Sequence, residues 1–532
     1  MEIHDYTWIF VVGIIAACAD AFGIGANDVA NSFASSVSSG SLTLAQACII
    51  AVFTEFLGAF LLGSNTAETI KSGIMDVKLF VPQPELMMLG MLCAVAGSAI
   101  WVLTASKFGM PVSTTHSIVG AIIGVGIAAF GGDAIKWDYS GVAKIVTSWF
   151  VSPVAAGIVT AIIYMPTKIF VLKSVNSLER GIKAIPIYFF ITSLISAFYL
   201  IYKGAPGTKA SKMSTGTIVG ISFGVAAGVT ALAWVLFVPW LRRRVVGKEN
   251  VRWFHIPIIH FVKPRPSIPA PEEIPGELEN GEGKDIQEKL TATGKTIEAE
   301  SAGTAQSDTE AEFQEQSRVK SIFTKVTDLA LRGVRKDVRN LDNKKLESVH
   351  EAAQKFDGDT EYLFSFLQVI TACLASFSHG SNDVANAAGP IAAIYDIWRT
   401  AEVDPKGKAE VPSWILAMAG AAIDLGLLTY GYHVMRKLGN GVTYLSPSRG
   451  FSAELGTSLT VLTASKIGLP VSTTHCITGA ITSIGLCNGS WRALNWKMLS
   501  WCFLSWIVTL PVAGVLAGLL FAYGKNAPTQ MI

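Results

Sequence analysis

The chain has 532 residues, of which 51% are hydrophobic and 15% are charged, and its formal net charge at pH 7 is +2. Soluble domains usually carry about 25% charged residues, so a water-soluble core cannot explain this composition, and the near-balanced charge gives no indication of nucleic-acid binding. All seven cysteines fall in apolar stretches, where we expect small buried side chains rather than a disulfide framework.

Long apolar runs recur along the whole chain, as in Ile185–Tyr202, Thr217–Trp240 and Trp501–Tyr523. A hydrocarbon core ~30 Å thick takes roughly 20 helical residues. The sequence therefore predicts an all-α polytopic membrane protein with about twelve membrane segments. We place them near 7–37, 42–63, 86–106, 110–130, 141–165, 184–203, 215–241, 362–395, 412–435, 451–466, 469–487 and 497–523.

Some of these segments are expected to be broken or re-entrant helices. The first and eighth segments are too long and too polar for plain spans, and the segments near 110 and 469 begin with proline. Proline is favoured in the first turn of a helix. We therefore expect Pro111 and Pro470 to mark helix starts.

The composition changes between Arg242 and Glu361. Lys263–Pro271 is proline-rich, and Pro275–Gln316 is acidic and poor in aromatic residues, so this part cannot bury enough apolar surface to fold alone. We predict an N-terminal membrane repeat over 1–241, a largely disordered loop over 242–361 and a C-terminal membrane repeat over 362–525. Within the loop, Ser321–Phe356 fits either an amphipathic surface helix or a solvated linker.

Basic residues predict how the chain is oriented in the membrane. Arg242, Arg243 and Arg244 directly follow a strong apolar segment, and a second basic group lies between the fifth and sixth segments: Lys168, Lys173, Arg180 and Lys183. Cytoplasmic loops carry an excess of Lys and Arg. The central loop is therefore expected in the cytoplasm, with both chain ends on the outer side.

Two motifs each occur twice in the same order. Gly25–Asn31 recurs as Gly380–Asn386, shifted by 355 residues (27 to 382), and Leu103–His116 recurs as Leu462–His475, shifted by 359 (116 to 475). Such spacing indicates an internal duplication. Seven segments precede the second copy, and this odd number predicts inverted-topology repeats, the plan of many secondary transporters. We find no P-loop or other ATP-binding motif of a primary pump.

The first motif, Gly-x-Asn-Asp-Val-Ala-Asn, places carboxylates at membrane depth, where an ionised group needs a partner. The neighbouring glycines are expected to weaken the helix and free backbone carbonyls to line a cavity. Oxygen donors of this kind suit a small hard cation. The candidate ligands are Asn27, Asp28, Asn382 and Asp383, and the alternative is polar contact between helices.

The second motif, Pro-Val-Ser-Thr-Thr-His, places hydroxyl groups beside the free backbone N–H groups of a helix N-terminus, which favours anions. Two such ends converging would bind an oxyanion without a buried arginine. The candidate residues are Ser113, Thr114, Thr115, Ser472, Thr473 and Thr474. The alternative is that the Ser and Thr side chains serve only as helix N-caps.

Several other titratable residues fall within apolar segments. Glu55 lies in the middle of one, and Glu454, Asp20 and Asp424 lie in others; by default an ionisable residue there is a candidate functional group. Glu55 and Glu454 do not occupy matching repeat positions. His116, His379 and His475 fit either a role in binding or proton transfer or a structural role, and the sequence does not decide between them.

The duplicated motifs Gly25–Asn31, Gly380–Asn386 and Pro-Val-Ser-Thr-Thr-His resemble the signatures of the inorganic phosphate transporter (PiT) family. The chain most resembles the family's eukaryotic sodium/phosphate symporters, and among these a fungal one. The resemblance covers roughly 1–240 and 360–525. It implies an all-helical inverted-repeat fold, a homodimer in the plasma membrane and no cofactor beyond Na⁺ as coupling ion. It also implies Na⁺ at Asn27, Asp28, Asn382 and Asp383, phosphate at the two Ser-Thr-Thr stretches, and acids important for transport at Glu55 and Glu454.

Three functional alternatives remain beside sodium-coupled symport of inorganic phosphate. The coupling ion could be the proton, the substrate could be another oxyanion such as arsenate, sulfate or molybdate, or the chain could be a phosphate sensor that does not transport. We expect no enzyme, because no nucleophile–base set or metal cluster stands out in the sequence.

Overall fold

The computed structural model describes residues 2–203, 213–267, 344–404 and 411–526. Every regular element within these ranges is a helix, and β-pairing there is limited to isolated bridges at Met75–Ile135 and Glu249–Ser267. The predicted disordered part of the central loop and most of the possible helix at 321–356 lie outside the described residues.

The described residues up to 267 form ten α-helices. Their bounds are α1 (Thr7–Asp28), α2 (Ala30–Ser38), α3 (Leu44–Leu62), α4 (Ser64–Ser72), α5 (Pro84–Lys107), α6 (Thr114–Phe130), α7 (Val142–Pro166), α8 (Ser177–Lys203), α9 (Thr215–Leu232) and α10 (Val238–Leu241). One-turn π segments at Thr167–Leu172, Ala233–Phe237 and Arg242–Val246 extend α7, α9 and α10, and 3-10 turns lie at Val77–Phe80, Gly132–Ala134 and Trp253–Phe261.

The C-terminal half is helical throughout its described residues. Its helices are α13 (Lys344–Glu351), α14 (Gly358–Thr400), α15 (Ser413–Tyr430), α16 (Tyr432–Val442), α17 (Pro447–Lys466), α18 (Thr473–Cys487) and α19 (Trp496–Asn526), with a 3-10 turn at Trp491–Ala493. Each of the twelve predicted segments is therefore helical. Nine described helices are long and apolar enough to cross a membrane, so the polytopic all-α class is confirmed, while the count of twelve stays a prediction.

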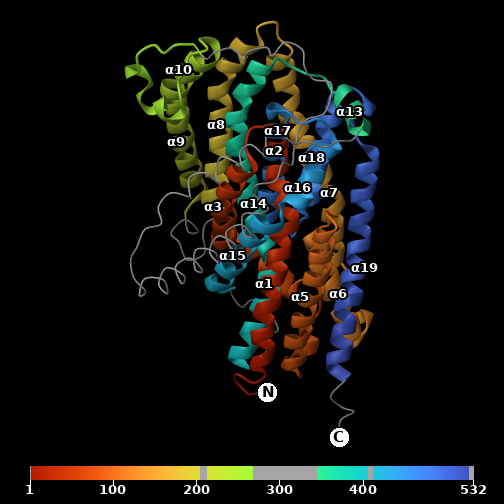
Figure 1. The fold of residues 1–532 in the computed structure, drawn as a ribbon. Helices are drawn as coiled ribbons and strands as arrows, with labels where there is room; N and C mark the ends of the chain where they lie inside the picture. Colours follow the sequence, from red (N-terminus) through yellow and green to blue (C-terminus); the bar gives the residue numbers. More distant parts are fainter. Residues whose placement is uncertain (1, 204–212, 268–343, 405–410, 527–532) are drawn as a thin grey trace, which may run out of the picture.

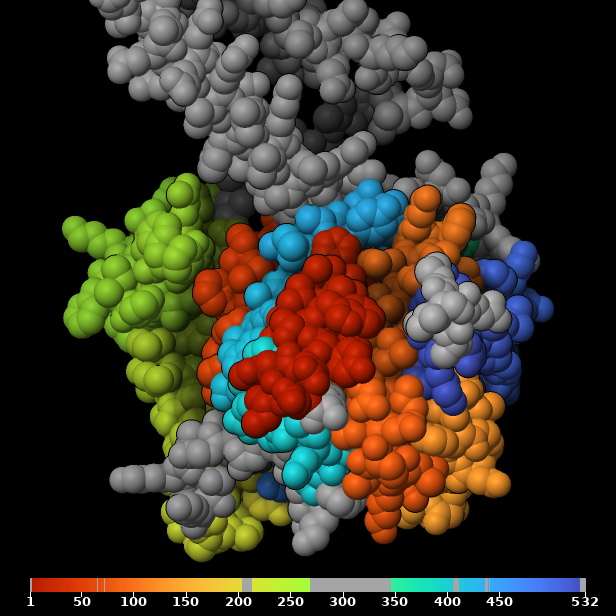
Figure 2. Space-filling model, turned by 90° about the horizontal axis from the view of Figure 1, so that it is seen from below, coloured from red at the N-terminus to blue at the C-terminus, as the bar shows by residue number. Residues whose placement is uncertain are grey.

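The helices that carry the first motif run in opposite directions. Near one end of the molecule, the Trp398 indole, close to the end of α14, donates a 3.0 Å hydrogen bond to Thr7 at the start of α1. Figure 2 looks onto this end and shows the N-terminal residues beside those of late α14. Antiparallel motif helices are what an inverted repeat requires, although the complete inverted topology remains a prediction.

The structure corrects the predicted effect of the motif glycines. Only the first motif interrupts its helix, at Val29 between α1 and α2, whereas α14 runs without a break through Gly380 and Pro390. A methyl group on Gly25 would collide with the carbonyl oxygen of Ile423 in α15, and one on Gly380 with the carbonyl oxygen of Glu55 in α3. The glycines thus allow helix backbones to touch rather than unwinding them.

The second motif lies where two helix hairpins meet. Figure 1 shows α5 and α6 in the half of the molecule that holds the chain ends, and α17 and α18 in the other half. Helix α6 packs on α19, and α18 packs on α7. Helices α6 and α18 make these contacts through glycines: Gly120 of α6 meets the Leu510 carbonyl of α19, and Gly479 of α18 meets the Pro153 carbonyl of α7.

The two hairpin helices begin later than the prolines predicted. Helix α6 starts at Thr114 and α18 at Thr473, three residues after Pro111 and Pro470. The serine before each threonine is the N-cap, because Ser113 Oγ accepts a 3.2 Å hydrogen bond from His116 N, and Ser472 does the same for His475 N at 3.3 Å. The prolines instead stiffen the connecting turns.

Helices α8 and α9 lie at the edge of the bundle and pack mainly on each other (Figure 1). Only 17% of the residues in the most apolar stretch of each helix are buried, as expected for helices that face lipid. Helices α10 and α13, which flank the central loop, lie at the end of the molecule opposite to the chain ends (Figure 1).

Candidate functional site

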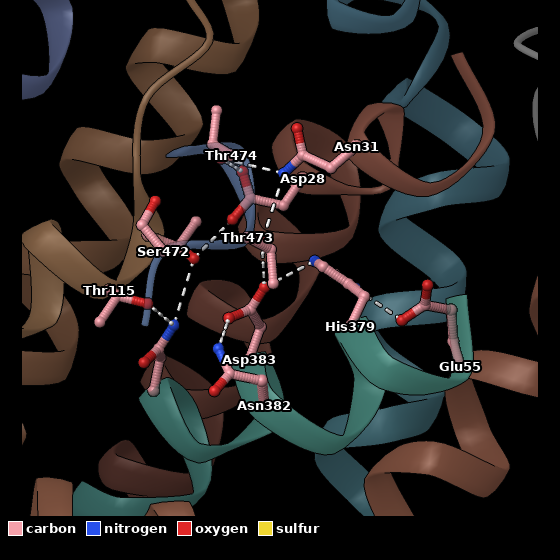
Figure 3. Close-up of polar contacts among 12 residues, drawn as sticks. Asp28, Asn31, Glu55, Thr115, His379, Asn382, Asp383, Ser472, Thr473 and Thr474 are labelled. Carbon is pink, nitrogen blue, oxygen red and sulfur yellow. Dashed lines mark hydrogen bonds and ion pairs between the residues drawn. The ribbon is translucent and has the colours of Figure 1, made fainter. Parts of the chain in front are cut away.

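The two motif aspartates meet the threonines of both hairpins in one fully buried cluster (Figure 3). Thr114 Oγ1 donates a 2.6 Å hydrogen bond to Asp28, and Thr473 Oγ1 donates one of the same length to Asp383. Thr474 Oγ1 lies 3.2 Å from the second oxygen of Asp28. Side chains more than 350 residues apart in sequence are thereby brought into direct contact.

The last asparagine of each motif reaches across to the hairpin of the other motif. Asn31 Nδ2 lies 2.9 Å from Thr474 Oγ1 (Figure 3), and Asn386 Nδ2 lies 3.2 Å from Thr114 Oγ1. Both asparagines are buried. Our sequence-based candidates omitted them, although their place in the duplicated motif was a sufficient signal to include them.

The two hairpin tips also contact each other directly. Thr115 Oγ1 donates to the Val471 carbonyl at 3.3 Å, and Thr474 Oγ1 lies 3.4 Å from the Val112 carbonyl. The first backbone N–H groups of a helix have no partner within that helix. The cluster therefore combines two positive helix ends, a set of hydroxyl groups and two carboxylates.

The first asparagine of each motif is engaged with the turn of its own hairpin. Asn27 Oδ1 accepts a 3.1 Å hydrogen bond from Val112 N, and its Nδ2 donates to the Met110 carbonyl at 2.9 Å. Asn382 Nδ2 donates to the Val471 carbonyl at 2.8 Å, and its Oδ1 accepts from Ser465 at 3.2 Å. These contacts hold the turns in place beside the aspartates.

His379 links Glu55 to the aspartate cluster. Its Nδ1 lies 2.7 Å from a Glu55 oxygen and its Nε2 lies 2.8 Å from Asp383 Oδ2 (Figure 3). One ligand atom from each of Asp28, His379 and Asp383 lies within 4.8 Å of the others. Such a set can hold a cation. Because His379 occurs only in the second motif copy, the repeat pattern alone could not have identified its role.

Glu454 lies in a separate hydrogen-bonded cluster. Its Oε1 accepts hydrogen bonds from Ser35, Ser36 and Gln368 at 2.7, 2.5 and 3.1 Å, and its Oε2 accepts one from Thr371 at 2.7 Å. These contacts join α2, α14 and α17. Within the described part of the chain, the hydrogen bonds of Glu454 therefore stabilise helix packing and reach none of the Asn-Asp or Ser-Thr-Thr residues.

His116 and His475 form a symmetric pair directly behind the hairpin tips. Their ring centroids are 4.6 Å apart, and His116 packs on Trp149 while His475 packs on Trp506. The Nδ1 of each histidine lies close to the carbonyl oxygen of the tryptophan that packs on the other, at 3.3 and 3.0 Å. This crossed arrangement favours a structural role that ties α6 and α18 to α7 and α19.

Comparison with known proteins identifies the family. A model of the phosphate transporter family matches residues 24–517, a range that contains both copies of both motifs. The chain belongs to this family. It is therefore a transporter rather than an enzyme, and the phosphate transporter resemblance is confirmed.

Individual relatives of this phosphate transporter family member match over nearly their full length. It is 38% identical to the phosphate-repressible phosphate permease pho-4 of Neurospora crassa, covering 99% of each chain. It is 30% identical to sodium-dependent phosphate transporter 1 of Mus musculus, covering 98% of this chain and 96% of that protein. A solved structure of the sodium-dependent phosphate transporter superposes with a TM-score of 0.70 at 28% identity, covering 97% of this chain and 99% of the other.

Proposed function

We propose that this protein is a sodium-coupled symporter of inorganic phosphate that works by alternating access. The observation that carries the proposal is the direct contact between two helix N-termini rich in hydroxyl groups and the aspartates Asp28 and Asp383. Anion-binding and cation-binding groups thus share one buried site. The names of the relatives in mouse and Neurospora supply the substrate and the coupling ion.

Phosphate is assigned to the two Ser-Thr-Thr stretches. The free N–H groups of α6 and α18 point toward the helix ends and favour an anion there. Thr114 and Thr473 donate their hydroxyl hydrogens to carboxylates in the structure. We infer that these hydroxyl groups turn to the phosphate when the hairpins separate, while Ser113 and Ser472 keep the helix starts capped.

Sodium is assigned to the carboxylates. Asp28 and Asp383 provide the negative charge, and Asn27 and Asn382 hold the adjoining turns and can add an amide oxygen. Moving a divalent anion into a negative interior costs about 2.3 kcal/mol per charge per 100 mV. Two or more sodium ions bound with the phosphate remove that barrier, which explains why both sets of groups lie in one site.

Glu55 is assigned a positioning role through His379, and Glu454 a role in packing the helices that enclose the site. We further propose that the protein forms a homodimer in the plasma membrane with its central loop in the cytoplasm. The basic residues that follow α10 support this orientation.

The proposal is tested by radiolabelled phosphate flux into proteoliposomes that contain the purified protein. We expect uptake when an inward sodium gradient is imposed and background counts when potassium replaces sodium. Uptake driven equally well by a pH gradient without sodium would assign proton coupling instead. Stronger competition by sulfate, molybdate or arsenate than by unlabelled phosphate would overturn the substrate, and phosphate binding without net flux would identify a sensor.

A further inference from the structure

The described start of the central loop folds back along the helix that precedes it. This segment, Trp253–Phe261, follows the basic end of the α9–α10 helix. The His260 ring nitrogen lies 2.7 Å from the Val235 carbonyl, and the Trp240 indole donates a 3.0 Å hydrogen bond to the Arg252 carbonyl.

These contacts fix the level of the segment relative to the membrane helix. Val235 precedes Arg242 by seven residues, which is about 10 Å along a helix. Val235 lies inside the membrane-length apolar helix Thr215–Val246. The segment therefore reaches back past the arginines toward the apolar part of that helix, instead of extending away from it.

Arg243 holds this arrangement together. Its guanidinium donates to the carbonyl oxygens of Ile259, Val262 and Lys263 at 3.2, 2.7 and 2.9 Å. It also forms a 2.6 Å ion pair with Glu249. The hydrogen bonds that Arg243 donates to this carboxylate hold the pKa of Glu249 below its usual value. The ion pair between Arg243 and Glu249 therefore stays charged at neutral pH. Together with the hydrogen bonds from Arg243, it fixes the segment to the end of the preceding helix.

The outward face of the segment is apolar. Trp253, Phe254, Ile258 and Phe261 are 75%, 48%, 51% and 89% exposed. The segment packs on the Ala233–Phe237 stretch of the membrane helix, whose Trp234 is 70% exposed. Figure 1 shows α9 and α10 at the edge of the bundle, beside α8. An aromatic surface continuous with a lipid-facing helix is expected to contact lipid as well.

The segment is also strongly basic. Residues 242–267 contain seven Lys or Arg and one Glu, a net charge of +6. Arg242 and Lys248 form ion pairs with Glu179 and Asp359. Three further exposed cations take part in no ion pair with a described residue: Arg252, Lys263 and Arg265.

We propose that Trp253–Phe261 lies in the plane of the membrane interface and binds anionic phospholipids. The aromatic and aliphatic side chains enter the acyl-chain boundary, and Arg252, Lys263 and Arg265 bind the lipid phosphate groups. The positive charge and the continuity with a membrane helix select an anionic lipid over a soluble acidic partner. The central loop would then begin from a point fixed on the membrane surface.

Native mass spectrometry of the full-length protein, purified with a defined mixture of phosphatidylserine and phosphatidylcholine, tests this proposal. The variant R252Q/K263Q/R265Q removes the three exposed charges. The matched control K173Q/R492Q/K497Q removes three exposed charges, one in the turn before α8 and two next to the start of α19. We expect retained phosphatidylserine to fall by at least ten-fold only in the first variant, because each Lys or Arg at a membrane surface contributes about a five-fold factor.

A second measurement on the native chain tests the same proposal even if the triple variant is poorly folded. A photoactivatable phosphatidylserine should label residues 252–265 of the native chain. Equal phosphatidylserine retention in both variants, or crosslinks from 252–265 to the chain's own acidic stretch at 275–316 instead of to lipid, would overturn the proposal. Neither readout uses phosphate flux, so a failure here is separate from a failure of the transport proposal.

Discussion

Replacing either central aspartate, as Asp28→Asn or Asp383→Asn, is expected to lower sodium-driven phosphate uptake by about 100-fold, since a loss of ~3 kcal/mol in cation binding is a factor of that size. Asparagine has nearly the same shape and keeps an oxygen that can accept the hydrogen bond from Thr114 or Thr473. The change therefore removes mainly the negative charge. Initial uptake rates at several sodium concentrations are the measurement.

The control for this prediction is Asp138→Asn, which changes an exposed aspartate in the loop before α7. We expect wild-type uptake from this variant. Each variant must also elute as a single species in detergent, so that a loss of transport is not a loss of folding. If Asp28→Asn or Asp383→Asn kept the sodium dependence of the wild type, these carboxylates would not be the sodium site.

Gly25→Ala is expected to prevent correct folding, because the added methyl group would overlap the Ile423 carbonyl oxygen in α15. A clash with backbone cannot be relieved by a change of rotamer, and overpacking of this kind costs about 3 kcal/mol or more. We expect a marked drop in the midpoint of thermal unfolding, or no monodisperse protein at all.

Gly224→Ala in α9 is the matched control, because no atom lies within 4 Å of the methyl group that it would add. Alanine is the better helix former by about 1 kcal/mol, so this variant should unfold at the same temperature as the wild type or slightly higher. A Gly25→Ala protein as stable as Gly224→Ala would contradict the close packing of α1 and α15.

The membrane class, the helical segments and the proximity of the two motifs could be predicted from sequence because each depends on a local pattern or on its repetition. Apolar runs mark helices, and the matching copies of Asn-Asp and Ser-Thr-Thr indicate one site made from two halves. The structure brings Asp28 together with Thr114, and Asp383 together with Thr473, in one buried cluster, while its role as the binding site stays a prediction. The duplication of the motifs, rather than their spacing along the chain, therefore predicted which residues lie close together.

The sequence says least where a residue's role depends on distant partners. A glycine that weakens a helix and a glycine that admits a neighbouring backbone look the same in sequence, and only the position of Glu55 or Ile423 distinguishes them. Glu454 is acidic and intramembrane like Glu55, yet its hydrogen-bond partners lie on α2 and α14, and its importance for transport stays a prediction. His379 required both Glu55 and Asp383 to be placed before its bridging position was visible.

The central claim is that cations on Asp28 and Asp383 and phosphate on the hairpin tips occupy one site and therefore stabilise each other. Coupling of this kind is reciprocal, so calorimetric titration of phosphate into the purified protein is the most direct measurement. We predict that the phosphate Kd falls steeply as sodium replaces potassium in the wild type, and that this dependence vanishes in the D28N/D383N double variant. A phosphate Kd that is the same in sodium and in potassium would contradict the account.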